Sequence, residues 1–122
     1  MIVTGDIETI LVRDLKPFGI PTYKKDAIPE GEVTEERITV IPKEPKPGTY
    51  WIKGFVVPDI NGMANKSRLT ELERQASGLR SVSSFDGSTY RYKVYSTHQE
   101  RDVPLKCHFV NVKIMFEILN VR

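Results

Sequence analysis

The last third of the chain contains a long stretch in which apolar residues occupy every second position. In the segment from Leu105 to Leu119, the even positions from 108 onward are His108, Val110, Val112, Ile114, Phe116 and Ile118. This alternation predicts a β-strand with one buried face, because successive side chains of a strand point to opposite sides. Fifteen extended residues span about 50 Å, which is longer than one face of a small domain. We therefore expect a bulge, a bend, or an end that projects to meet another chain.

Two segments carry apolar residues at steps of three and four and predict amphipathic helices. The first follows Thr4 and ends at the breakers Pro17 and Gly19. The second runs from about Lys66 to Leu79. Each helix has a single apolar stripe, so each is expected to lie on the surface of a sheet.

Three further segments predict strands, at residues 37–41, 49–57 and 89–97. Residues 42–48, with three prolines and a glycine, exclude helix and central strand and predict a stiff loop between the first two strands. We expect an irregular loop over residues 19–36 and a polar connection over residues 98–104.

Turn chemistry separates the remaining elements. The sequence Asp59-Ile60-Asn61-Gly62 stops the second strand, and Asp86-Gly87 is a strong signal for a tight turn before the third. The predicted order is therefore helix, strand, strand, helix, strand, strand. Short or hairpin-like connections between successive strands predict an α+β fold, with a mainly antiparallel sheet and both helices packed on one face.

Length and charge narrow the class of protein. A chain of 122 residues fits one domain, residues 1–122. Eighteen basic and sixteen acidic residues give a net charge of +2, without the clustered positive charge of a nucleic-acid or membrane surface. We expect a cytoplasmic protein without a signal peptide or a membrane span.

No residue set predicts catalysis. Cys107 is the only cysteine, and its neighbour His108 points to the opposite face of the strand. A pair of Cys107 with His98 across the hairpin is conceivable, but an inert, half-buried cysteine is favoured. The acidic residues Glu30, Glu32, Glu35 and Glu36 indicate a solvated loop. We expect no enzyme activity, no cofactor and no metal site.

One sheet face combines basic and aromatic residues and is the candidate interaction surface. Its predicted members are Trp51, Lys53, Phe55, Arg91, Lys93 and Tyr95, together with Met115, Glu117 and Leu119 from the odd face of the last strand. Such a face can stack on unpaired bases. Alternatively, the long loop or a neighbouring subunit covers it.

Four local features carry a resemblance to a known family. They are residues 16–23 (KPFGIPTY) at the end of the first helix, the loop 28–31 (IPEG) before the strand 37–40 (RITV), the strand 51–58 (WIKGFVVP), and the alternating strand 109–118. With its order of elements, the chain resembles the tail-completion and tail-terminator proteins of tailed bacteriophages and prophages over nearly its whole length.

The resemblance implies a structural role in virion assembly. Proteins of this family form rings, often hexameric, at the head-proximal end of the tail, where they cap the tube or join tail to head without cofactor or catalysis. It implies that the partners are copies of the chain itself and phage tail-tube or head-connector proteins, in the cytoplasm of the host bacterial cell or in the virion. The alternative function is a small nucleic-acid- or peptide-binding module that uses the basic–aromatic face.

Overall fold

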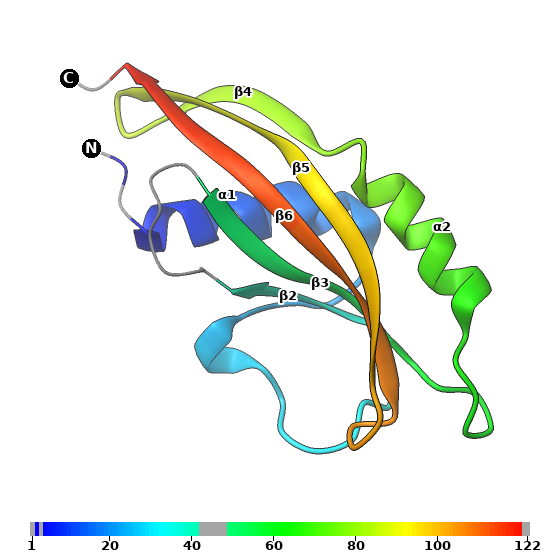
Figure 1. The fold of residues 1–122 in the computed structure, drawn as a ribbon. Helices are drawn as coiled ribbons and strands as arrows, with labels where there is room; N and C mark the ends of the chain where they lie inside the picture. The colour runs from blue at the N-terminus through cyan, green and yellow to red at the C-terminus, as the bar shows by residue number, and fades with distance from the viewer. Residues whose placement is uncertain (1, 3, 42–48, 121–122) are drawn as a thin grey trace.

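The computed structural model describes residue 2, residues 4–41 and residues 49–120, and it describes the backbone alone at residues 4, 49–53 and 120. The predicted stiff loop, residues 42–48, lies outside the described residues. Two α-helices lie against a curled, mostly antiparallel sheet of six strands (Figure 1). The predicted α+β class is confirmed.

The helices are α1 (Thr4–Leu15) and α2 (Lys66–Ala76), and single 3-10 turns form η1 (Lys16–Phe18) and η2 (Lys25–Ala27). The strands in chain order are β1 (Thr22–Lys24), β2 (Arg37–Ile41), β3 (Thr49–Pro58), β4 (Arg80–Phe85), β5 (Ser88–Asp102) and β6 (Cys107–Asn120). Their order across the sheet is β1-β2-β3-β6-β5-β4, and only the β1–β2 pair is parallel.

One hydrophobic core joins both helices to one face of the sheet. Figure 1 shows α1 behind the sheet and α2 beside β5. The helices contribute Ile7, Ile10, Leu11, Leu15, Leu69, Leu72 and Ala76, and the strands contribute Ile38, Val40, Phe55, Val57, Tyr90, Tyr92, Val110, Val112, Ile114 and Phe116. Full burial of each large aliphatic side chain contributes roughly 1.5–3 kcal/mol. Within the described ranges, neither α-helix lies on the opposite face, which is called the outer face below.

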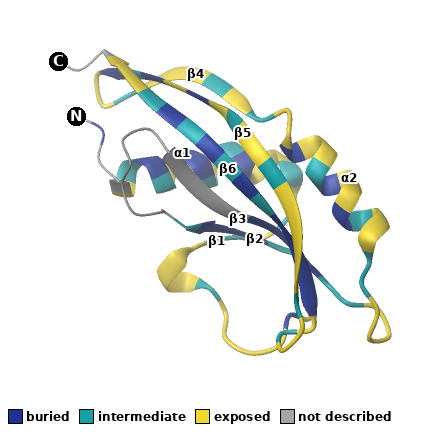
Figure 2. Cartoon of the chain, viewed as in Figure 1, coloured by how far each residue is buried: buried dark blue, intermediate teal, exposed yellow. Residues whose placement is uncertain are grey.

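The alternation of the last strand has the predicted consequence. In β6 the side chains of Val110, Val112, Ile114 and Phe116 are buried in the core, and Figure 2 shows buried and partly exposed residues alternating along the strand. β6 lies between β3 and β5. The expected irregularity appears as register shifts in the pairing of β6 with β3 and with β5, which allow the sheet to curl.

Gly54 causes the shift in β3. It has a φ of +48°, and a Cβ atom at this position would lie 1.5 Å from the carbonyl oxygen of Val110. Only glycine allows this approach of β3 to β6. After Gly54 the alternation changes face, so Phe55 is 0% exposed in the core and Val56 pairs with Phe109. The prediction that Phe55 shares the exposed face of Lys53 is therefore wrong.

Two strands were not predicted. β1 lies in the segment expected to be a loop, and its three residues pair in parallel with β2. β4 is an edge strand that buries little, so its sequence lacks an apolar alternation. The Asp86-Gly87 turn that joins β4 to β5 is confirmed, with φ values of 48° and 76°. β5 continues to Asp102, through most of the predicted polar connection, because it pairs with β6 along this length.

Candidate functional site

A groove of about 560 Å³ runs along the outer face of β4, β5 and β6. Its lining residues are Arg80, Ser81, Val82, Arg91, Tyr92, Lys93, Met115 and Glu117. Strand register explains the grouping, because residues directly opposite each other in an antiparallel pair lie on the same face. Arg80 pairs with Lys93, which pairs with Met115, while Val82 pairs with Arg91, which pairs with Glu117.

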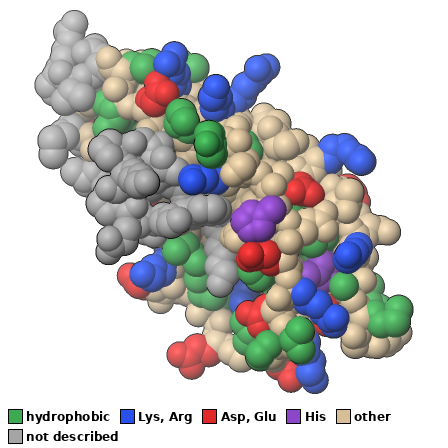
Figure 3. Space-filling view, viewed as in Figure 1, with side chains coloured by type: hydrophobic (Ala, Val, Ile, Leu, Met, Phe, Trp, Pro, Cys, Tyr) green, Lys and Arg blue, Asp and Glu red, His purple; other side chains and the backbone are tan. Residues whose placement is uncertain are grey.

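The groove is mainly basic but contains one ion pair. Arg91 contacts the Oε2 atom of Glu117 through Nε at 2.9 Å and through Nη2 at 2.8 Å. Arg80 and Lys93 add two further positive charges to the lining. Figure 3 shows the outer face, where lysine and arginine side chains gather over the end of the molecule that holds β4 and the end of β6. This surface suits a partner with acidic and apolar groups.

The structure brings together four of the predicted surface residues, namely Arg91, Lys93, Met115 and Glu117, in this groove. Tyr95 lies at the register shift of β5, is 60% exposed, and has Lys113 Nζ at 5.3 Å from its ring centroid. Leu119 is exposed near the end of β6. The side chains of Trp51 and Lys53 lie outside the described part of the chain, and Phe55 is in the core.

The sequence interpretation missed Arg80 and Val82, the two residues that β4 contributes. Val82 is 73% exposed on β4, which among the described strands pairs with β5 alone. The signal that identifies them is the Asp86-Gly87 turn. A two-residue turn fixes the register of its hairpin, which places residue 82 opposite Arg91.

A second group of exposed apolar side chains lies at the other end of the sheet. Ile60 and Met63 belong to the turn after β3, and Val103 belongs to the turn between β5 and β6. The two turns are linked, since Arg101 Nη2 donates a hydrogen bond to the carbonyl of Gly62 at 3.2 Å. We call these three apolar residues the hairpin tip.

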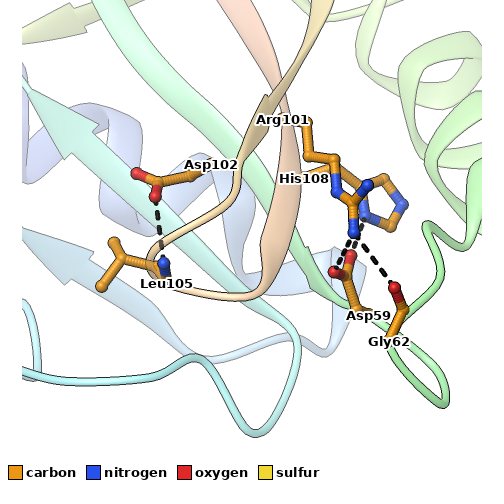
Figure 4. Close-up of polar contacts among 6 residues, drawn as sticks. All are labelled: Asp59, Gly62, Arg101, Asp102, Leu105 and His108. Atoms are coloured by element: carbon orange, nitrogen blue, oxygen red, sulfur yellow. Dashed lines mark hydrogen bonds and ion pairs between the residues drawn. The ribbon is translucent and has the colours of Figure 1, made fainter.

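Beside the hairpin tip lies a buried polar cluster (Figure 4). The Asp59 carboxylate accepts from Arg101 Nη2 at 2.7 Å, and His108 Nδ1 lies 3.3 Å from its other oxygen. The hydrogen bond from Arg101, followed by the contact with His108, lowers the pKa of Asp59, so the carboxylate is ionised at neutral pH. Asp102 accepts from the backbone N–H of Leu105 at 3.1 Å and orders the neighbouring turn. The cluster holds the β3 turn against the β5–β6 hairpin.

The conceivable Cys107–His98 pair does not form. Across the hairpin Cys107 is opposite Asp102, whereas His98 is opposite Asn111, four residues further along β6. That separation corresponds to about 13 Å, which is beyond hydrogen-bond reach. Cys107 is buried in a small apolar cluster with Val33, Val56 and Phe109.

The acidic residues before β2 are distributed over separate contacts. Glu36 accepts from Arg68 Nε at 2.7 Å and from Arg68 Nη2 at 2.9 Å, which joins this loop to α2. Glu32 pairs with Lys106 at 3.2 Å, and Glu30 and Glu35 are exposed. Within the described residues, no group of three or more His, Cys, Asp and Glu side chains is arranged to hold a metal ion.

No protein-family model, curated protein or solved structure matches this chain. In the described part of the chain, neither helix combines the length and the apolar character that crossing a bilayer requires.

Proposed function

We propose that this chain is a structural subunit that associates head to tail with copies of itself into a closed ring, in the manner of phage tail-completion proteins. The observation that carries the proposal is the presence of two different surfaces at opposite ends of the sheet, each with exposed apolar side chains. One is the groove with the free edge of β4, and the other is the hairpin tip. Figure 1 shows β4 and the hairpin turn after β5 at these opposite ends.

The free edge of β4 lacks the usual protection against pairing with another chain. Soluble proteins blunt such edges with charges, prolines or bulges. The residues between Arg80 and Asp86 are Ser-Val-Ser-Ser-Phe, without a charge or a proline. An extended segment of a neighbouring copy can therefore add to this edge through backbone hydrogen bonds, while the groove accepts its side chains.

The position of the two surfaces favours a ring over a symmetric dimer. A two-fold dimer uses the same patch on both subunits, whereas a contact between two different patches repeats until a ring closes. The hairpin tip offers three exposed apolar side chains, and the groove offers Val82 and Met115 as apolar contacts. The resemblance extends the proposal to phage tail-tube or head-connector proteins as further partners, in the cytoplasm of the host bacterial cell or in the virion.

Light scattering coupled to size exclusion tests the proposal with one charge variant for each surface. The wild-type chain is expected to give a multiple of 13.9 kDa. Val82→Lys removes the groove contact and Val103→Lys removes the tip contact, so each variant is expected to be monomeric. The matched control is Ala27→Lys on η2, an exposed position away from both surfaces, which is expected to assemble like the wild type.

Mixing the two variants distinguishes a head-to-tail contact from a symmetric one. The Val103→Lys chain keeps its groove and the Val82→Lys chain keeps its tip, so the mixture is expected to form a species of two chains and no larger ring. A wild type that stays at 13.9 kDa at every concentration contradicts the proposal. Variants that assemble like the wild type contradict the chosen surfaces.

Binding of a single-stranded nucleic acid or an acidic peptide is the second candidate function. The observation that favours it is the basic lining of the groove, with Arg80, Arg91 and Lys93 close to the exposed ring of Tyr95. The ion pair of Arg91 with Glu117 and the contact of Lys113 with Tyr95 weaken it. It predicts binding that falls with salt and is lost when Arg91 and Lys93 are both replaced. Absence of binding to single strands at low salt contradicts it.

A further inference from the structure

A small pocket lies where the first turn of α2 faces the β5–β6 hairpin. Its volume is about 140 Å³. The side of α2 contributes Ala64, Lys66 and Leu69, and the strands contribute Gln99, Glu100, Arg101 and His108. Leu69 and His108 are buried and form the floor, while Lys66, Gln99 and Arg101 are exposed and form the rim.

His108 brings an unused hydrogen-bonding atom to this floor. Its side chain is 3% exposed, and its Nε2 atom is buried without a hydrogen-bond partner among the described residues. The other ring nitrogen, Nδ1, lies 3.3 Å from the Asp59 carboxylate and carries the proton, because an ionised carboxylate can only accept. Figure 4 shows the second nitrogen directed away from Asp59, toward the side of the view on which α2 lies. Buried polar atoms of folded proteins are nearly always hydrogen-bonded, so this nitrogen indicates a binding partner that the protein chain itself does not supply.

The first turn of α2 supplies the second feature of a binding site. The Asn65 side chain accepts from the Arg68 N–H at 3.4 Å, and the Asn65 carbonyl accepts from the Leu69 N–H at 3.2 Å. A helix provides no internal acceptor for the N–H groups of its first residues, here Lys66 and Ser67. These groups and the helix dipole favour an anion at this position.

Two cations, Lys66 and Arg101, and one acidic residue, Glu100, line the pocket. Lys66 and Arg101 lie on its rim. The Asp59 charge is compensated by Arg101, and the Glu100 carboxylate is bound on the outer face by Asn111 at 3.1 Å. A further acid, Glu73, accepts from the Gln99 amide at 2.9 Å.

From this geometry we infer that the pocket binds a small oxyanion, the phosphate or carboxylate group of a ligand. The N–H groups at the start of α2 and the Lys66 ammonium bind its oxygens, and His108 Nε2 donates to it after taking a proton from solvent. The resulting imidazolium then donates from both nitrogens, to the ligand and to Asp59. Binding therefore takes up one proton, so it weakens as the pH rises.

Nuclear magnetic resonance of the full chain with ¹⁵N-labelled histidine tests this inference. The probes are inorganic phosphate and, separately, acetate, at constant ionic strength with chloride as the balancing anion. We expect a saturable change at His108 Nε2 near pH 6 and no saturable change at the exposed His98, the only other histidine. Saturation with phosphate alone assigns a phosphate group, saturation with acetate alone assigns a carboxylate, and both results support the site.

Two variants and the wild type keep the test decisive. Lys66→Gln is expected to weaken anion binding roughly twofold to fivefold, which is the usual effect of one charge near the start of a helix. Lys24→Gln is the control at an exposed position on β1, and it is expected to leave anion binding unchanged. The wild-type titration needs no variant to fold. A His108 signal that does not respond to either anion, or that drifts linearly without saturation, overturns the inference, because a buried water or an adventitious ion then accounts for the pocket.

Discussion

Replacement of Phe55 by alanine distinguishes two placements of this side chain. Simple alternation along the strand places Phe55 on the outer face, whereas the bulged strand of the structure places it in the core. Phe55 is 0% exposed, and its ring centroid lies 5.0 Å from that of Phe18. Truncation of a buried phenylalanine costs about 3–5 kcal/mol, whereas a surface substitution changes stability by about 0.5 kcal/mol at most. An unfolding entropy of about 2.1 cal/mol/K per residue gives about 0.26 kcal/mol/K for 122 residues. The melting temperature is therefore expected to fall by about 12–20 °C.

Urea unfolding followed by far-ultraviolet circular dichroism measures the loss, at a protein concentration low enough to keep association from contributing. Tyr95→Ala is the matched aromatic control, since Tyr95 is 60% exposed and its ring contacts Lys113. The control is expected to lose less than about 1 kcal/mol. A Phe55→Ala loss as small as that of the control refutes the reasoning, because Phe55 then cannot lie in the core.

Two further predictions concern the bulge and the loop before β2. Gly54→Ala is expected to lower the free energy of unfolding by more than about 2 kcal/mol, because the left-handed conformation alone costs about 1–2 kcal/mol and the added Cβ meets the Val110 carbonyl. Gly31 has a φ of +88° but open space around it, so urea unfolding should show a smaller loss for Gly31→Ala. Equal losses for the two variants contradict the close approach of β3 to β6. The hydrogen bond from Arg68 lowers the pKa of Glu36 below its ordinary value of 4.5. The stability that this pair contributes is therefore fully present above pH 4.5, and it is lost as the pH falls through the lower pKa of the folded state. Both side chains are about one-third exposed, so Glu36→Gln is expected to lower the free energy of unfolding by up to about 1 kcal/mol at pH 7 and by progressively less in acid. If the free energies of unfolding of variant and wild type differ by the same amount at pH 3 and at pH 7, this assignment is contradicted.

The parts of the fold that follow from local periodicity could be predicted from the sequence. The apolar face of β6, the stripe of α2 and the Asp86-Gly87 turn each depend on residues that are close in the chain. The predicted end of α2 is Leu79, whereas the helix in the structure ends at Ala76. The α+β class follows from the order of these elements.

The parts that depend on contacts between distant residues could not be predicted. The change of face at Phe55 requires knowing that Gly54 meets the Val110 carbonyl on another strand. Edge strand β4 buries almost no apolar side chain, so burial leaves no pattern in its sequence. The contacts of Asp59 with Arg101 and His108 join residues that are 42 and 49 positions apart. In the sequence, Asp59 is only the first residue of a turn.

Hydrogen exchange measured by mass spectrometry at low and at high protein concentration tests the proposed assembly most directly, because it locates the contact. Edge-strand amides exchange slowly only when they are covered or paired. We predict that exchange slows at high concentration in peptides that cover β4 (Arg80–Phe85) and the turn at residues 103–106, while α2 is unchanged. Exchange that is independent of concentration, or protection confined to the helices, contradicts head-to-tail association through the groove and the hairpin tip.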